Sequence, residues 1–335
     1  MIKRKYLYYT TAILIILLIG VYYVKYTQVK NEKSTTVKNQ SLENTNFNVD
    51  KNGYLSYPLD REKVKFSRET INQTGNLLVS KIIYQSGNGN IYGLLVIPTS
   101  SPELLPGVVL LPGAGVSKES ELGLAMKIAE LDYAVLVIDQ RGVGETSGFF
   151  PNLDEDYSGF LKGQEPYQYL MVYDALRGFD LLKSAPFVDP EKIVMVGESL
   201  GGRVAIIATA IDRNVKGVVG ISTAGFGFTS GNDTSKNMFI KSIDSDHYIS
   251  TITPRKLVMI HNLYDKNIPV SSAVKSFSKA DEPKKFVLVN DTSCNHGYCD
   301  SMHQGLVESL DFVTGIRHAN MDEGFNSSIA INASI

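Results

Sequence analysis

Apolar residues are distributed unevenly along the chain, and their pattern changes three times. Positions 6–24 form an apolar run without a charged residue, whereas residues 27–53 are polar and lack any apolar period. From residue 63 to about residue 318, short apolar runs alternate with segments of helical spacing. We therefore expect four parts: a transmembrane segment within 1–26, a polar stalk or linker over 27–62, a folded domain over 63–318 and a polar C-terminal tail over 319–335.

The N-terminal run has the length and borders of a single-pass membrane anchor. At about 1.5 Å per residue, a helix over 6–24 spans roughly 28 Å, which is close to the thickness of the hydrocarbon core. Tyrosines stand at both ends of the run, and the basic residues 3–5 precede it. The run ends in the bulky segment 21–24, which favours an uncleaved signal anchor over a cleaved signal peptide.

The orientation of this anchor depends on the positive charges on its two sides, and their numbers are nearly equal. Lysines also follow the apolar run, but the tight basic cluster before it favours a location of the large C-terminal part outside the cytoplasm. We therefore expect a protein of the cell membrane.

The folded domain reads as alternating strands and helices. Two β-rich segments, 77–85 and 91–98, predict an antiparallel hairpin. Continuous apolar runs indicate strands buried on both faces, and they occupy 107–112, 134–139, 192–197, 215–222, 256–261 and 285–290. The spacing of apolar residues, or the position of a segment between or after predicted strands, predicts helices over 121–131, 167–184, 200–211, 270–280 and 301–316. The order predicts an α/β fold with a mostly parallel eight-stranded sheet and helices on both faces.

Two predicted connections, 146–166 and 223–253, are longer than connections in compact domains usually are. Such segments are commonly lids or binding loops. We expect both to emerge near the carboxyl edge of the strands, where open α/β sheets bind ligands.

The overall composition excludes several classes of protein. The net charge is -2, without the basic excess typical of nucleic-acid binding proteins. Only 2 cysteines are present, so neither a disulfide-rich scaffold nor a four-thiolate zinc module is expected.

The most specific chemical signal is Gly-Glu-Ser-Leu-Gly at 197–201, which follows an apolar strand and precedes a helix. This is the G-x-S-x-G pattern of a nucleophile elbow in its required context. A serine on such a sharp turn needs small neighbours, and the following helix directs its N-terminus at a developing negative charge. Ser199 is therefore the candidate nucleophile.

Together with three further motifs, this segment resembles the α/β-hydrolase family, in particular its dienelactone-hydrolase and acyl-aminoacyl-peptidase-like branches. The resemblance covers about residues 63–317, and its other motifs are LPGAG at 111–115, DQRGVGETSG at 139–148 and YDKNIP at 264–269. It implies the hydrolysis of an ester, thioester or amide through an acyl-serine intermediate.

A serine hydroxyl needs a base, and the chain has 5 histidines. His296 lies in the loop after the final strand, where the family places its base, and His303 is the substitute. Asp265, just after the strand 256–261, is expected to orient the histidine, with Asp291 as the alternative.

The oxyanion hole is expected to combine the backbone N–H groups of Leu200 and Ala114. The segment before Ala114 departs from the family's common His-Gly pair because it reads Pro112-Gly113. Only a backbone donor is required there, so the reaction does not depend on that histidine.

Cys294 and Cys299 flank the candidate base. In an oxidising compartment a disulfide between them is chemically plausible and would restrict where His296 points, whereas two free thiols that lie near each other are the alternative. With His296 and His303 they also admit a zinc site, but the spacing of known zinc modules is lacking and the site would consume the base. No metal and no cofactor are expected.

The sequence thus predicts a membrane-anchored serine hydrolase, carboxylesterase-like (EC 3.1.1), that acts on a small-molecule ester or a short acyl or peptide substrate. One alternative is a serine peptidase of the acyl-aminoacyl or prolyl type, although only the short segment 27–62 stands where such enzymes commonly carry a large propeller. A non-catalytic binding protein with the same fold is the alternative from another class.

Overall fold

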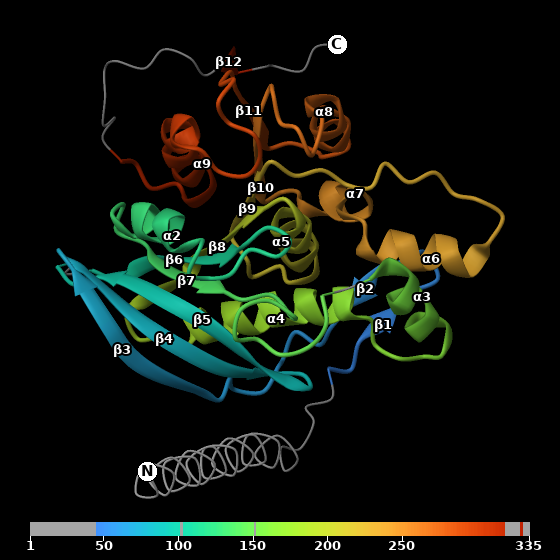
Figure 1. Ribbon diagram of the computed structural model, residues 1–335, viewed down its shortest axis with the longest axis horizontal. Coiled ribbons are helices and arrows are strands. Elements are labelled where there is room, and N and C mark those ends of the chain that lie inside the picture. Colours follow the sequence, from blue (N-terminus) through green and yellow to red (C-terminus); the bar gives the residue numbers. More distant parts are fainter. Residues whose placement is uncertain (1–44, 101–102, 151, 319–328, 331–335) are drawn as a thin grey trace, which may run out of the picture. The chain divides into compact units, whose positions relative to one another are not determined.

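The computed structural model of the protein describes residues 45–100, 103–150, 152–318 and 329–330. Its main feature is a 10-stranded sheet in the order β12-β11-β10-β9-β8-β6-β7-β5-β4-β3 (Figure 1). The strands of this sheet are β3 (Phe66–Thr74), β4 (Leu77–Ser86), β5 (Gly89–Pro98), β6 (Leu105–Leu111), β7 (Ala134–Ile138), β8 (Val188–Glu198), β9 (Gly217–Ile221), β10 (Lys256–Asn262), β11 (Lys284–Val289) and β12 (Ile329–Ala330).

The centre of the sheet is parallel, as its continuous apolar runs predict. Six strands, in the order β7, β6, β8, β9, β10 and β11, pair in parallel with one another. Every residue of β6, β7 and β9 is buried. Their carboxyl ends therefore meet at one edge, where the loops that follow them can combine their side chains.

Two strands of this sheet were not predicted, so the expected eight-stranded sheet is wrong. Strand β3 pairs antiparallel with β4 at the edge of the sheet, and all of its residues are exposed. Its polar sequence FSRETINQT carries no apolar alternation that could reveal a strand. Strand β12 lies in the predicted C-terminal tail and pairs antiparallel with β11.

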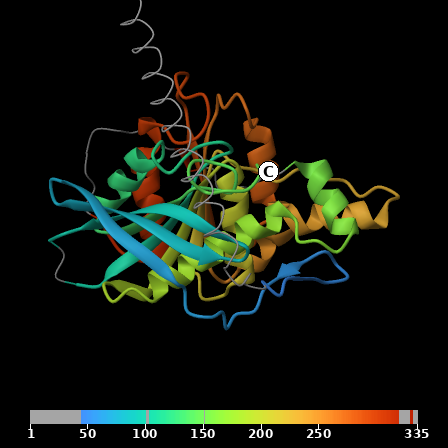
Figure 2. The ribbon, with the colours of Figure 1, turned by 60° about the horizontal axis from the view of Figure 1, so that its bottom comes forward.

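Helices cover both faces of the sheet, as predicted, and each face has its own apolar core. Helices α4 (Tyr167–Lys183), α5 (Leu200–Ile211) and α8 (Val270–Ser278) contribute to one core. Helices α2 (Leu122–Ala129) and α9 (His303–Thr314) contribute to the other. Figures 1 and 2 show these helices on either side of the twisted sheet.

The two long connections form short helices that pack against each other. The first contains α3 (Leu153–Leu161), and the second contains α6 (Thr234–Ile243) and α7 (Ser245–Tyr248). The Tyr157 hydroxyl donates to Asp233 at 3.0 Å, and the ring of Phe239 contacts Tyr157 and Phe160. Helices α3 and α6 consequently lie side by side in both views (Figures 1 and 2).

The described part of the predicted stalk belongs to the folded domain, which corrects the expected boundary at residue 63. Within residues 45–62, two short strands, β1 (Asn48–Val49) and β2 (Leu55–Ser56), pair antiparallel. Leu55 and Tyr57 are buried in the core, and the Leu55 N–H donates to the Tyr248 hydroxyl at 2.7 Å. These few apolar residues are too widely spaced to form a period, so the sequence pattern hides their burial.

Within the described ranges, no helix combines the length and the apolar composition needed to cross a membrane. The predicted anchor over 6–24 lies outside the described residues.

Candidate active site

Ser199 stands on a strained turn between β8 and α5. Its backbone angles, φ 49° and ψ −114°, lie in a region that residues with a side chain rarely adopt. Helix α5 approaches the end of β6 so closely that a Cβ on Gly201 would lie 2.0 Å from the Leu111 carbonyl oxygen. The glycine of the motif is therefore required by close packing, and the turn holds the serine at the carboxyl edge of the sheet.

The backbone of Ser199 is held by hydrogen bonds, whereas its side-chain hydroxyl is not. The Ser199 N–H donates to the Ile221 carbonyl oxygen at 2.9 Å, and the Thr223 hydroxyl donates to the Ser199 carbonyl oxygen at 2.7 Å. Among the described residues, no group forms a hydrogen bond with the Ser199 hydroxyl. Catalytic hydrogen bonds often form only when a substrate binds, so the free hydroxyl does not exclude Ser199 as the nucleophile.

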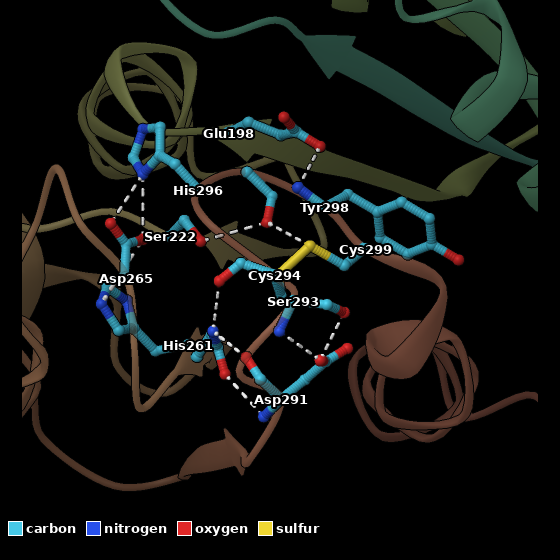
Figure 3. The surroundings of a disulfide bond; sticks show 12 residues. Glu198, Ser222, His261, Asp265, Asp291, Ser293, Cys294, His296, Tyr298 and Cys299 are labelled. Carbon is cyan, nitrogen blue, oxygen red and sulfur yellow. Dashed lines mark hydrogen bonds and ion pairs between the residues drawn. A yellow bond between two sulfur atoms is a disulfide. The ribbon is translucent and has the colours of Figure 1, made fainter.

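Asp265 and His296, predicted as a pair, are in direct contact. The Nδ1 atom of His296 lies 2.9 Å from both carboxylate oxygens of Asp265 (Figure 3). The Asp265 side chain is fully buried, whereas 20% of the His296 side chain is exposed. With its Nδ1–H donating to Asp265, His296 keeps Nε2 available as a proton acceptor.

The surroundings of Asp265 keep its carboxylate ionised. Burial alone would raise its pKa, but the N–H groups of Ile268 and Asn267 and the ring of His296 together lower the pKa below its ordinary value. The two N–H groups donate to Oδ1 at 2.8 and 2.9 Å. A charged Asp265 can therefore orient the imidazole and stabilise its protonated form.

The loop that carries His296 is closed against the nucleophile turn. The Tyr298 N–H donates to Oε1 of Glu198 at 3.0 Å, and the Ser222 hydroxyl donates to the Gly297 carbonyl oxygen at 3.2 Å (Figure 3). A Cβ on Gly297 would lie 2.8 Å from Oε2 of Glu198. Glu198 immediately precedes Ser199, so these contacts join the loop that carries the candidate base to the turn that carries the candidate nucleophile.

The two alternative residues occupy other positions. His303 begins α9, and its Nδ1 lies 3.0 Å from the Tyr298 hydroxyl. Asp291 accepts hydrogen bonds from the backbone and side chain of Ser293, at 2.8 and 2.6 Å. The acid in contact with His296 is therefore Asp265.

Of the two possibilities for the cysteines, the structure has the disulfide, which closes the loop around His296. Cys294 and Cys299 are joined with their Cα atoms 5.9 Å apart (Figure 3). The Asn262 side-chain amide donates to the Cys294 carbonyl oxygen at 2.6 Å, and the Lys266 N–H donates to the Asn295 carbonyl oxygen at 2.8 Å. In this state neither sulfur is free to bind a metal, and within the described ranges no cluster of metal-binding side chains occurs.

The candidate oxyanion donors lie on two elements beside Ser199. Leu200 is the first residue of α5, where backbone N–H groups have no partner within the helix. A Cβ on Gly113, next to Ala114, would lie 3.7 Å from the Cβ of Ser199. The Gln140 amide donates to the Pro112 carbonyl oxygen at 2.7 Å and so fixes the peptide plane that enters this loop.

A buried lysine supports the same loop, and sequence reasoning did not single it out. Lys118 is 1% exposed, and its Nζ lies 2.8 Å from Asp139 and 2.9 Å from Glu145. Its N–H also donates to Asp139 at 2.7 Å. The segment DQRGVGETSG therefore holds the β6–α2 loop through Asp139 as well as Gln140. The only sequence signal for this role was the resemblance of that segment to a family motif.

A second unpredicted feature is a pair of buried carboxyl groups behind the site. Glu121 and Glu198 share a hydrogen bond. Burial and the negative charge of Glu198 raise the pKa of Glu121 to about 8, and burial raises that of Glu198 despite its bonds to Tyr298 and Glu121. The pair retains one proton near neutral pH, because two buried anions in contact repel each other.

With this geometry in view, the chain was compared with known proteins. A family model described as acetyl xylan esterase matches residues 62–225. A protein named YfhR from Escherichia coli O157:H7 is 29% identical over 169 residues, which cover 49% of this chain and 54% of that protein. A putative hydrolase, YtaP, from Bacillus subtilis (strain 168) is 27% identical over 135 residues and 40% of each chain. The chain thus spans about half the length of the curated relatives it matches.

Solved structures show the same fold at low sequence identity. An acetyl xylan esterase from Paenibacillus sp. R4 has a TM-score of 0.62 and 16% identity, covering 84% of this chain and 92% of that one. A glucuronoyl esterase from Solibacter usitatus has a TM-score of 0.57 and 13% identity, covering 76% and 87%. These matches establish an α/β-hydrolase fold.

We predict that breaking the disulfide lowers activity more than stability. The two cysteines are only 5 positions apart in the sequence, so the disulfide closes a short loop. On the chain-entropy model, its reduction lowers the free energy of unfolding by about 2 kcal/mol. Displacing His296 by about 1 Å costs on the order of 100-fold in rate. Esterase activity and melting temperature, measured with and without reductant, check this. The double variant Cys294→Ser/Cys299→Ser should be insensitive to reductant. Full activity with both thiols alkylated would contradict the prediction.

We also predict a pH-dependent stability difference for Glu121→Gln. The pKa of Glu121 is about 8 in the folded protein and near its ordinary 4.5 when unfolded, so wild-type stability falls as the pH rises through this window. Glutamine stays neutral at every pH. Relative to wild type, the free energy of unfolding of the variant should therefore increase by on the order of a few kcal/mol across this pH range. Urea unfolding from about pH 5 to about pH 9 measures this difference. A constant difference would show that the carboxyl pair does not hold a proton.

Proposed function

From the premise that this chain belongs to the α/β-hydrolase family, we propose that it hydrolyses carboxylic esters through an acyl-serine intermediate. Ser199 acts as nucleophile, His296 as general base and acid, and Asp265 as the group that orients His296. The backbone N–H groups of Leu200 and Ala114 stabilise the oxyanion. The fold and the family-model match support an esterase of the EC 3.1.1 type.

In the first half of the reaction, Nε2 of His296 takes the proton of the Ser199 hydroxyl as its oxygen attacks the ester carbonyl carbon. The carbonyl oxygen becomes negatively charged and accepts hydrogen bonds from the two backbone donors. When the intermediate collapses, the bond to the alcohol oxygen breaks and His296 returns the proton to that oxygen. The alcohol leaves, and the acyl group remains on Ser199.

In the second half, water replaces the alcohol. His296 takes a proton from water, the resulting hydroxide attacks the acyl carbon, and the bond to Ser199 breaks. His296 then protonates the serine oxygen, which releases the carboxylic acid and restores the enzyme. No cofactor is needed, because each step transfers only a proton and an acyl group.

The observation that carries this proposal is the buried, ionised Asp265 bonded to His296, on a loop closed against the strained Ser199 turn. A strained backbone and a buried charge both reduce stability, so a purely structural role explains their coincidence poorly. This favours an enzyme over a non-catalytic binding protein. The esterases among the similar structures favour ester over peptide substrates.

We predict that Ser199→Ala lowers kcat for para-nitrophenyl acetate by on the order of 10⁴-fold or more, because the nucleophile is lost while the turn accepts a smaller side chain. Ser235→Ala, at an exposed serine of α6, is the matched control and should behave as wild type. His296→Ala should resemble Ser199→Ala, whereas His303→Ala should retain most of the rate. A rate above a tenth of wild type in Ser199→Ala would remove the assignment of the nucleophile, and the reverse pattern for the histidines would transfer the base to His303.

We further propose that residues 6–24 anchor the protein in the cell membrane and that the catalytic domain faces the extracytoplasmic side. The uncharged run with tyrosines at both ends supports the anchor. The Cys294–Cys299 disulfide supports the orientation, since such bonds persist in oxidising compartments.

The anchor predicts that the full chain stays with membranes after a high-salt or alkaline carbonate wash and is released only by detergent. A chain that begins at residue 45 should be soluble and have the same kcat/KM, because the folded unit lies within residues 44–335. Cell fractionation with an esterase assay tests both statements. A mature full-length protein whose sequenced N-terminus lies beyond residue 24 would replace the anchor with a cleaved signal peptide.

A further inference from the structure

Arg203 lies in the first turn of α5, one helical turn beyond Ser199. Its N–H donates to the Ser199 carbonyl oxygen at 3.3 Å, the same oxygen that accepts the Thr223 hydroxyl. The long Arg203 side chain therefore starts next to the candidate nucleophile, under the connection that begins with Thr223.

The guanidinium of Arg203 packs against an aromatic ring of that connection. Its Cζ lies 4.2 Å from the ring centroid of Phe226, which is 37% exposed. Within the part of the chain that the structure describes, no hydrogen bond or ion pair joins the guanidinium to another group. Burial lowers the pKa of Arg203 to about 10, so the group remains charged near neutral pH.

Two arginines whose side chains are buried are paired with carboxylates. Arg61 binds Asp180 at 2.8 Å, and Arg141 binds Asp174 at 2.8 Å. Asp244 attracts Arg203 electrostatically but forms no ion pair with it. One Asp244 oxygen instead accepts the N–H groups of Phe226 and Asp246, at 3.0 and 3.1 Å.

The same connection is approached by another cation. The Nζ of Lys275, on α8, lies 3.9 Å from the position of a Cβ on Gly227, the residue after Phe226. The facing Asp246 is already bound to Lys279 at 2.6 Å. Arg203 and Lys275 thus both lie beside the start of this connection, and among the described residues neither forms an ion pair with a carboxylate.

A guanidinium that stacks on an aromatic ring close to the nucleophile turn, and that has no carboxylate partner among the described residues, is available to bind an anionic group. We propose that Arg203, stacked on Phe226, binds a carboxylate group of the ester substrate a few bonds from the scissile carbonyl. A planar guanidinium suits this role because it pairs with a carboxylate through two parallel hydrogen bonds. The inference rests on the proposed function and specifies its substrate class as anionic esters.

The carboxylate can belong to the acyl group or to the alcohol, and two matched ester pairs separate these sources. Monomethyl glutarate and methyl pentanoate differ by a carboxylate on the acyl side. Para-acetoxybenzoate and para-acetoxybenzamide differ by a carboxylate on the alcohol side. For each pair, kcat/KM is measured for wild type, Arg203→Met and Arg203→Lys. Arg213→Met, at an exposed arginine just beyond α5, is the control for loss of a positive charge.

For one of the pairs, Arg203→Met should reduce the preference for the anionic ester by roughly 10- to 100-fold, the range for a hydrogen-bonded charge. Its kcat/KM for the neutral ester should stay near wild type. Arg203→Lys should restore part of the preference, and Arg213→Met should leave it unchanged. An equal loss for both members of each pair would assign Arg203 a structural role, and an unchanged preference in both pairs would also overturn the proposal.

A binding measurement keeps this test independent of turnover. Glutarate is titrated calorimetrically into Ser199→Ala and into Ser199→Ala/Arg203→Met, and para-hydroxybenzoate serves in the same way for the alcohol side. One of these anions should bind at least roughly 10-fold more weakly when Arg203 is replaced. Equal affinities for both anions would overturn the carboxylate site. If wild type hydrolyses none of the four esters, the proposed esterase function fails, while these titrations still decide the role of Arg203.

Discussion

The hydrogen bond between the buried carboxylate of Asp265 and the imidazole of His296 is the interaction on which the site depends. It fixes which ring nitrogen carries the proton, and it places a negative charge where an imidazolium forms during the reaction. The charge of Asp265 is held below the surface by two backbone N–H groups of its own loop. Those donors offset much of the cost of burying the carboxylate.

The parallel sheet makes this arrangement possible. Ser199 follows β8, Asp265 follows β10 and His296 follows β11, so three segments distant in sequence meet at one edge. Several contacts restrict the conformation of the loop that carries His296. A disulfide closes this loop, and the side chains of Asn262 and Ser222 donate hydrogen bonds to its backbone. Glu198 connects it to the nucleophile turn through a hydrogen bond from the Tyr298 N–H. Because Glu198 is part of the Gly-Glu-Ser-Leu-Gly motif, the motif carries a structural contact to the base in addition to the nucleophile.

The sequence predicted what depends on local patterns. Continuous apolar runs identified the buried parallel strands, and the glycine motif identified the turn at Ser199. It missed β3, whose side chains are all exposed, and the burial of Leu55 and Tyr57, because neither leaves a periodic apolar signal. The proton-sharing pair of Glu121 and Glu198 and the position of Arg203 arise only when separate elements pack together. Charged residues in a sequence are usually solvated, and no local pattern distinguishes these from the others.

The central claim is that Ser199 is a nucleophile activated by His296, and covalent labelling tests it most directly. The intact protein is treated with a fluorophosphonate probe, digested and analysed by peptide mass spectrometry. The account predicts one adduct, on Ser199, with labelling strongly slowed in His296→Ala and absent in Ser199→Ala. A natively folded protein that takes up no probe, or that carries the adduct on another residue, would contradict it.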